Sequence, residues 1–171
     1  MVSFPNGGRI LLFNDRVASS ILNVIKLLDA NVPRFTCKRK IVAASLFSID
    51  ATHGSIDTLC TYNGPVLKDH ECENIEGSCG CAHVEPRLIL QGLRLAQFAL
   101  RRNVLYCQYS PCTHCANIII DSKIIDVFIF REPYRDIRGL ELISSAMKVG
   151  LVKELEEGNY ASIEKWVSDN R

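Results

Sequence analysis

Two short motifs far apart in the sequence constrain this chain more than any other feature. The first is His83-Val84-Glu85, and the second is Pro111-Cys112-Thr113-His114-Cys115. One imidazole and two thiolates can hold Zn²⁺, and three protein ligands leave one tetrahedral position open, as in catalytic rather than structural zinc sites. Water in that position has a pKa of roughly 7 instead of about 15.7. Glu85 is not needed as a ligand, so it is a candidate general acid and base.

Two prolines indicate that both motifs lie at helix starts. Cys112 and Cys115 are three residues apart and share one face of a helix, and Pro111 suits the first position of such a helix. His83 and Glu85 are two residues apart, so both reach one ion only if they lie at the turn into a helix that begins at Pro86. The sequence therefore predicts two helix starts that face each other across a zinc ion.

The cysteine motif alone would fit other kinds of site. Pro-Cys-x-x-Cys also occurs in redox motifs and zinc ribbons, and a structural zinc knuckle or a non-catalytic zinc-binding module is the alternative. Such a site needs a fourth protein ligand and has no use for a glutamate beside the histidine. Glu85 therefore favours the catalytic interpretation.

Composition excludes several other classes. The chain has 171 residues, of which 47% are hydrophobic and 23% charged, so we expect a single globular domain over residues 1–171. Its net charge of +1 gives no electrostatic sign of nucleic-acid binding. No apolar run approaches the roughly 18 residues of a membrane span, and the N-terminus does not look like a secretory signal. Eight cysteines without such a signal indicate metal ligands and core thiols in a reducing compartment.

Hydrophobic periodicity and turn residues predict an α/β fold. A short extension (1–13) precedes the domain, and a long loop rich in metal ligands lies at 63–82. The predicted helices are 16–29, 86–100, a helix through the second motif to 122, 137–149 and a terminal helix capped by Ser162; the predicted strands are 41–49, 56–62, 104–107, 124–130 and 151–155. The first two strands form a hairpin, and crossover helices join the later ones. The expected fold is a mixed five-stranded sheet with helices on both faces.

On these residues the chain resembles the cytidine deaminase superfamily, most closely the deoxycytidylate (dCMP) deaminases of bacteria and phages. Beyond the two zinc motifs, the resemblance rests on Cys37-Lys38-Arg39 ahead of the first strand, Tyr62-Asn63-Gly64 after the second, and Tyr134 after a later strand. It implies a three-layer α/β/α fold and zinc-dependent hydrolysis of dCMP to dUMP and ammonia. His83, Cys112 and Cys115 would hold the zinc, and Glu85 would move protons.

The resemblance also implies contacts with nucleotides. Asn63 and Tyr134 would contact the substrate, and we add Ala82 and Ser110, which adjoin the zinc motifs. The candidates for a substrate or effector phosphate are Arg39, Lys40 and Gly64, although a short basic run is more often a solvated surface. Relatives are typically hexamers activated by dCTP with Mg²⁺ and inhibited by dTTP, in the cytoplasm of a bacterium or a phage-infected cell. Whether dCTP is also a substrate stays open.

Three positions depart from the pattern of the family. Val84 replaces the usual alanine, Arg87 lies where an asparagine is usual, and Ala43 replaces a glycine in the first strand. Arg87 is therefore a candidate for a different contact. The missing glycine makes allosteric regulation less secure than catalysis.

A second zinc site is a further expectation. Cys37, His70, Cys72 and Cys79 could form a closed site that pins the long loop, with Cys81 as a substitute for Cys79. The alternative is that these are free thiols with unrelated packing roles.

A competing function uses the same chemistry on a polymer. A deaminase that edits nucleic acid, of the tRNA adenosine or DNA cytidine type, would need a basic groove and stacking aromatic residues. The near-neutral chain with dispersed aromatic residues argues against it.

Overall fold

The computed structural model describes residues 15–31, 37–50, 52–66, 71–75 and 78–158. Its centre is a five-stranded sheet in the order β2-β1-β5-β6-β7. The strands are β1 (Ala43–Asp50), β2 (Ser55–Tyr62), β5 (Arg102–Tyr109), β6 (Val127–Glu132) and β7 (Lys148–Leu151). β1 is antiparallel to both of its neighbours, whereas β5, β6 and β7 are parallel. The predicted mixed five-stranded α/β sheet is confirmed.

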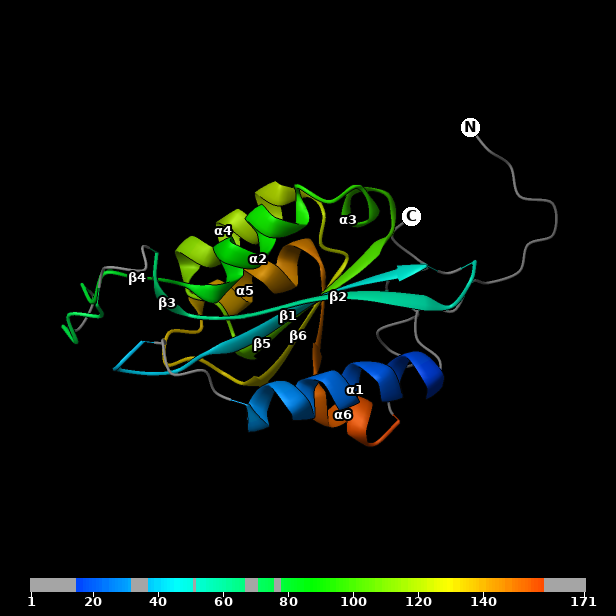
Figure 1. Cartoon of the computed structure of the whole chain (residues 1–171), viewed down its shortest axis with the longest axis horizontal. Coiled ribbons are helices and arrows are strands. Elements are labelled where there is room, and N and C mark those ends of the chain that lie inside the picture. Colours follow the sequence, from blue (N-terminus) through cyan, green and yellow to red (C-terminus); the bar gives the residue numbers. More distant parts are fainter. Residues whose placement is uncertain (1–14, 32–36, 51, 67–70, 76–77, 159–171) are drawn as a thin grey trace.

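Helices cover both faces of this sheet (Figure 1). One face carries α1 (Asp15–Ala30) and α6 (Val152–Glu156), and the other carries α2 (Val84–Gly92), α4 (Thr113–Ser122) and α5 (Arg138–Ala146). The strands supply alternate residues to the two cores, because successive side chains of a strand point to opposite faces. In β5, for example, Leu105 packs with the α2–α4–α5 layer and Tyr106 with the α1–α6 layer.

The helix predicted over 86–100 is wrong in its length. It divides into α2 and the short α3 (Ala96–Leu100). Glycine is a poor helix former, and Gly92 ends α2. A Cβ at Gly92 would lie 2.7 Å from Cδ2 of Leu46, so a larger residue at this helix end would force the Leu46 side chain to move.

The end of the described chain also differs from the prediction. The helix predicted to reach residue 149 ends at Ala146, and the last strand lies at 148–151. The strand predicted over 151–155 is wrong: Val152–Glu156 form α6, because Val152 and Leu155 lie three apart and pack into one core. Glu154 supports the start of α6 by accepting the Leu151 N–H at 2.8 Å. The extension 1–13 and the helix capped by Ser162 lie outside the described residues.

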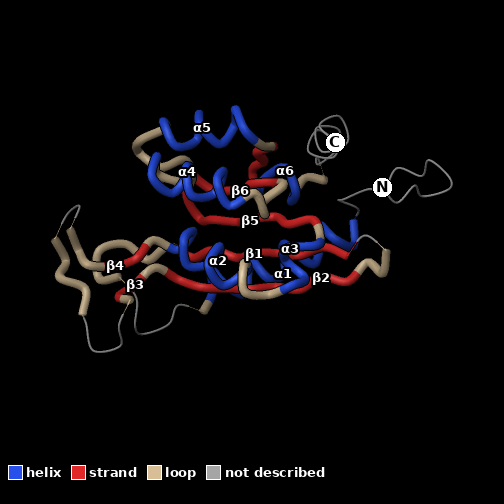
Figure 2. Tube along the Cα trace, turned by 90° about the horizontal axis from the view of Figure 1, so that it is seen from above, coloured by secondary structure: helices blue, strands red, loops and turns tan. Residues whose placement is uncertain are grey.

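The long loop contains a small ladder that leads to the first zinc motif. β3 (Gly64–Pro65) pairs with β4 (Cys81–Ala82) as an antiparallel two-stranded sheet. Figure 2 shows this ladder beyond the end of the main sheet. The ladder delivers the chain directly into His83 and α2. In the described part of the chain, no helix is long and apolar enough to cross a membrane.

Candidate active site

The two zinc motifs meet at two helix starts, as predicted. His83 caps the N-terminus of α2, and Cys112 caps that of α4. His83 Nδ1 lies 3.7 Å from Cys112 Sγ and 3.3 Å from Cys115 Sγ. The helix of the first motif begins at Val84, two residues before the predicted start at Pro86. Both motifs present their side chains from turns at helix starts rather than from helix interiors.

These distances fit a zinc ion. Zn–N and Zn–S bonds of about 2.05 and 2.3 Å at a tetrahedral angle place nitrogen and sulfur about 3.6 Å apart, close to the two separations observed. The three donor atoms lie within 4.8 Å of one another. His83, Cys112 and Cys115 can therefore hold one zinc ion while leaving a coordination position for water.

Glu85 lies beside this ligand set but is buried. The residue is only 6% exposed. Burial raises the pKa of Glu85, and the nearby His83 charge opposes that shift. A buried carboxyl group with a raised pKa is suited to exchange protons near neutral pH.

The surroundings of Cys112 favour its thiolate form. Hydrogen bonds from Cys115 and His83 lower the pKa of Cys112 to about 3. The same hydrogen bond with Cys112 raises the pKa of Cys115, because the two sulfur atoms share one proton. Zinc replaces this proton when it binds thiolates.

Gly139 packs closely against the backbone of the cysteine motif. It lies in α5, where a Cβ would be 2.1 Å from the carbonyl oxygen of Pro111 and 2.7 Å from the carbonyl carbon of Cys112. Only glycine lets α5 approach this peptide so closely. The role of Gly139 cannot be predicted from the sequence, because a glycine near a helix start carries no sign of the segment against which it packs.

The predicted substrate residues lie around the same end of the sheet. The buried Asn63 side chain accepts the Val42 N–H at 2.8 Å and donates to the Lys40 carbonyl at 2.7 Å. Ser110 Oγ accepts the Tyr134 N–H at 2.7 Å. Asn63 and Ser110 therefore fix backbone segments beside the zinc motifs.

The other two predicted substrate residues are more exposed. Ala82 is half-buried in β4, directly before His83, and Tyr134 is half-buried after β6. Contacts of these four residues with a substrate stay predictions.

The predicted phosphate residues differ in their surroundings. Lys40 Nζ lies 3.5 Å from the centroid of the Tyr109 ring, a cation–π contact at the end of β5. Arg39 donates to the Ile75 carbonyl at 3.4 Å, and Gly64 is buried in β3. Lys40 thus lies against the strand end that leads into the cysteine motif, whereas Arg39 contacts the long loop.

Four cysteines form a second cluster beside the first. The Sγ atoms of Cys37, Cys72, Cys79 and Cys81 lie within 4.8 Å of one another, with Cys37 Sγ 3.7 Å from Cys72 Sγ and 3.9 Å from Cys79 Sγ. All are free thiols. Tetrahedral zinc with Zn–S bonds of about 2.3 Å requires sulfur atoms about 3.8 Å apart. Cys81 joins Cys79 rather than replacing it, and His70 lies outside the described residues.

The loop around this cluster already favours a thiolate. Burial opposes ionisation of Cys72, but backbone hydrogen bonds from Asn74 and Lys38, together with thiol hydrogen bonds from Cys81 and Cys37, outweigh it and lower the pKa of Cys72 to about 6. Asn74 and Gly80 have positive φ angles of 61° and 70°, which lets the chain turn tightly between the cysteines. Backbone donors aimed at sulfur are typical of supporting groups around metal thiolates.

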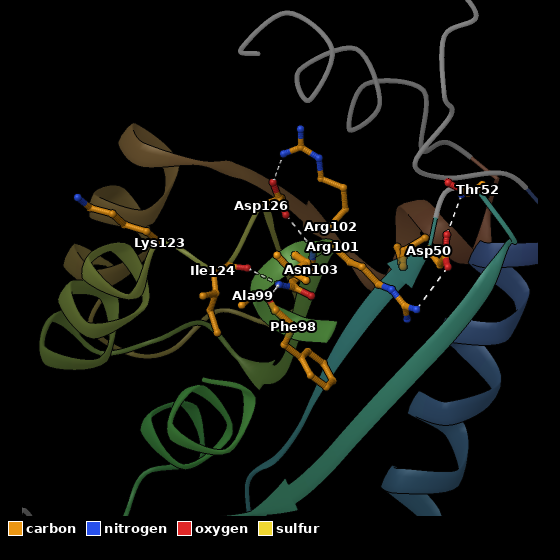
Figure 3. Close-up of a pocket in the computed structure, with 12 residues that line it drawn as sticks. Asp50, Thr52, Phe98, Ala99, Arg101, Arg102, Asn103, Lys123, Ile124 and Asp126 are labelled. Carbon is orange, nitrogen blue, oxygen red and sulfur yellow. Dashed lines mark hydrogen bonds and ion pairs between the residues drawn. The ribbon is translucent and has the colours of Figure 1, made fainter. Parts of the chain in front are cut away.

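A separate cavity of about 490 Å³ lies at the opposite end of β5 (Figure 3). Its charged groups are largely paired with one another: Arg101 contacts Asp50 at 3.3 Å, and Arg102 forms an ion pair with Asp126. β5 begins at Arg102 in this cavity and ends at Tyr109 near the cysteine motif. The cavity is therefore remote from the two metal-ligand clusters.

Comparison with known proteins identifies the family. A family model described as the cytidine and deoxycytidylate deaminase zinc-binding region matches residues 37–131, which include both zinc motifs and cover more than half of the chain. The chain belongs to this family of deaminases. No curated protein sequence matches the chain significantly.

Solved structures confirm the fold. The dCMP deaminase of the cyanophage S-TIM5, in complex with dCMP and dUMP, has a TM-score of 0.61 at 20% identity and covers 81% of this chain and 98% of its own. Its apo form has a TM-score of 0.58 at 17% identity, covering 81% and 99%. The Rib2 deaminase of Aspergillus oryzae, a C-terminal deletion mutant, has a TM-score of 0.50 at 12% identity, covering 88% and 96%. The similarity at these identities establishes a cytidine-deaminase-like α/β fold.

Proposed function

We propose that the protein is a zinc-dependent hydrolase that converts dCMP and water to dUMP and ammonia. The observation that carries this proposal is the buried Glu85 carboxyl group beside three ligand atoms spaced for one zinc ion. A purely structural site would not need this carboxyl group. When bound, the zinc ion supplies the positive charge that lets water ionise near neutral pH.

Glu85 transfers protons in the proposed reaction, and the zinc ligands position the metal. Glu85 accepts a proton from the attacking water and delivers it to N3 of the cytosine ring. The water oxygen forms the new bond at C4. Glu85 then takes the remaining proton from that oxygen and gives it to the N4 amine as the C4–N4 bond breaks, which leaves the C4 carbonyl of dUMP and ammonia. His83, Cys112 and Cys115 would hold the zinc ion, and Glu85 follows His83 closely on the same helix start, so no large movement of the side chains would be needed between these steps.

The nucleotide monophosphate is favoured by particular residues. Tyr62-Asn63-Gly64 and Tyr134 match the positions that the resemblance to dCMP deaminases indicates, and the S-TIM5 enzyme of similar fold was crystallised with dCMP and dUMP. Lys40, held over Tyr109, offers a cation near the cysteine motif for a phosphate. The near-neutral charge of the chain disfavours a nucleic-acid editing deaminase.

A substrate panel tests this assignment. We expect the zinc-loaded protein to release ammonia from dCMP with a kcat/KM at least about tenfold above that for deoxycytidine, since a charge-assisted phosphate contact contributes about 1.5–3 kcal/mol. The panel includes dCTP, guanine and a single-stranded oligonucleotide. Equal rates with deoxycytidine would contradict monophosphate recognition, and preference for the oligonucleotide would favour the editing function.

We further propose that Cys37, Cys72, Cys79 and Cys81 hold a second, structural zinc ion. A four-thiolate set is closed to water and stabilises the loop that carries it. The spacing of the sulfur atoms and the backbone donors to Cys72 support this assignment.

Metal analysis of two serine variants tests the second site. We expect about two zinc ions per wild-type chain and about one in Cys72→Ser, with a lower melting temperature, because three thiolates hold zinc less well than four. Cys60→Ser is the control, because Cys60 is exposed in β2 and lies outside both clusters. A wild-type content of one zinc ion would contradict the second site and leave the catalytic proposal intact.

Regulation and assembly stay predictions from the resemblance. They comprise activation by dCTP with Mg²⁺, inhibition by dTTP, use of dCTP as a substrate and association as a hexamer. The same applies to Arg39, Lys40 and Gly64 as effector residues and to a location in the cytoplasm. Kinetics of dCMP deamination with each triphosphate would test the regulatory part.

A further inference from the structure

Arg87 makes an unusual set of contacts for a residue on the catalytic helix. Its guanidinium group donates to three backbone carbonyl oxygens: those of Tyr62 at 3.3 Å, Gly64 at 2.7 Å and Pro65. The side chain is half-buried. Hydrogen bonds from a charged group are stronger than neutral ones, and the planar fork of arginine can serve several acceptors at once.

The three carbonyl groups belong to the segment on either side of Asn63. Two backbone hydrogen bonds join Asn63 to the chain ahead of β1. Its N–H donates to the Val42 carbonyl at 3.0 Å, and its carbonyl accepts the Cys37 N–H at 3.2 Å. Arg87 therefore forms hydrogen bonds to the chain at the point where β1, β2 and the four-cysteine cluster meet. Moving this segment would disturb a predicted substrate residue and a predicted metal ligand together.

The same segment sets the path of the chain into the catalytic site. Gly64 and Pro65 form β3, which pairs with Ala82 and Cys81 of β4. His83 follows Ala82 directly and begins α2, the helix that also carries Glu85 and Arg87. The contacts therefore close a ring from α2 through Arg87 to β3, across to β4 and back into His83.

We infer that Arg87 is a positioning residue that fixes the β3–β4 ladder against α2 and thereby holds Ala82 and His83 in place for zinc and substrate. Among the described residues, the hydrogen bonds of its guanidinium group go to the carbonyl oxygens of Tyr62, Gly64 and Pro65 rather than to a metal ligand, so it acts through the ladder. This inference deepens the proposed function by assigning a role to the residue that replaces the asparagine of the family pattern.

Metal affinity without substrate gives a test that does not depend on the proposed reaction. Co²⁺ replaces zinc, and its visible absorption distinguishes a site with two thiolates from a site with four. Competition with a chelator then measures the affinity of each centre. We expect Arg87→Ala to weaken Co²⁺ binding at the His83 site about tenfold, the lower end of the effect of losing groups that orient metal ligands. Arg87→Lys replaces the guanidinium fork by a single ammonium group, so its Co²⁺ affinity at the His83 site should lie between those of the wild type and Arg87→Ala.

Arg94→Ala is the matched control, because Arg94 lies just beyond the same helix and is exposed; it should leave both affinities at the wild-type value. In steady-state kinetics Arg87→Ala should raise the KM for dCMP more than it lowers kcat, because the reacting groups remain. Wild-type affinity at the two-thiolate site of Arg87→Ala would overturn the inference, even if the melting temperature fell. If every variant binds Co²⁺ as expected but dCMP is not deaminated, the proposed function fails and the positioning role stands.

Discussion

Replacing Glu85 by glutamine is expected to abolish most of the activity while leaving the metal in place. The amide would keep the shape of the side chain but could not carry protons from water to the substrate, and general acid–base catalysis typically contributes about 10²–10⁴-fold. The kcat for dCMP should fall by a factor in that range. The measurement is ammonia release by zinc-loaded protein, with zinc content determined on the same samples.

The burial of Glu85 makes this variant a clean test. Because burial already raises the pKa of this carboxyl group, a neutral amide is at least as well accommodated in the folded protein, so we expect no fall in melting temperature. Glu141→Gln, at an exposed position of α5, is the control and should keep full activity. If Glu85→Gln kept most of the wild-type kcat, the residue could not be the proton carrier.

Replacing Gly139 by alanine is expected to remove the catalytic zinc without touching a ligand. The added methyl group would overlap the Pro111 carbonyl oxygen, at 2.1 Å, and the Cys112 carbonyl carbon, at 2.7 Å. These are backbone atoms, so α5 or the cysteine motif must shift. Overpacking typically destabilises a fold by about 1–3 kcal/mol, and we expect an effect in that range together with loss of about one zinc ion per chain.

Thermal denaturation and zinc analysis of Gly139→Ala test this packing role. Ser144→Ala, on the exposed side of the same helix, controls for the introduction of an alanine into α5 and should match the wild type in both measurements. The four-cysteine cluster should keep its metal in both variants, because a Cβ at Gly139 would meet the backbone of Pro111 and Cys112 and Ser144 is exposed. A stable Gly139→Ala protein with full zinc content would show that the close approach of α5 is not required.

The zinc motifs could be located from sequence because metal chemistry restricts both residue type and spacing. Histidine, glutamate and two cysteines at these positions have few alternative uses, and the prolines indicated helix starts, which the caps at His83 and Cys112 bear out. The sheet was also predictable, since its central strands are nearly uniform apolar runs. The strand bounds were less accurate, because pairing extends strands beyond their apolar residues.

Errors occurred where tertiary packing overrode local pattern. Gly92, the last residue of α2, lies close to Leu46 of β1, a contact between residues far apart in the sequence. The segment 152–156 reads as an apolar strand, but two of its residues pack beside α1 as a short helix. The full membership of the four-cysteine cluster likewise depends on the β3–β4 ladder, whose two strands are too short to carry a sequence pattern.

Formation of dUMP from dCMP is the most direct test of the account. Purified protein is stripped of metal, reloaded with zinc and incubated with dCMP, and ammonia and dUMP are quantified together. We expect equal amounts of both products with the zinc-loaded protein and neither with the stripped protein. A zinc-loaded, folded protein that yields no dUMP at any substrate concentration would contradict dCMP deamination as its function.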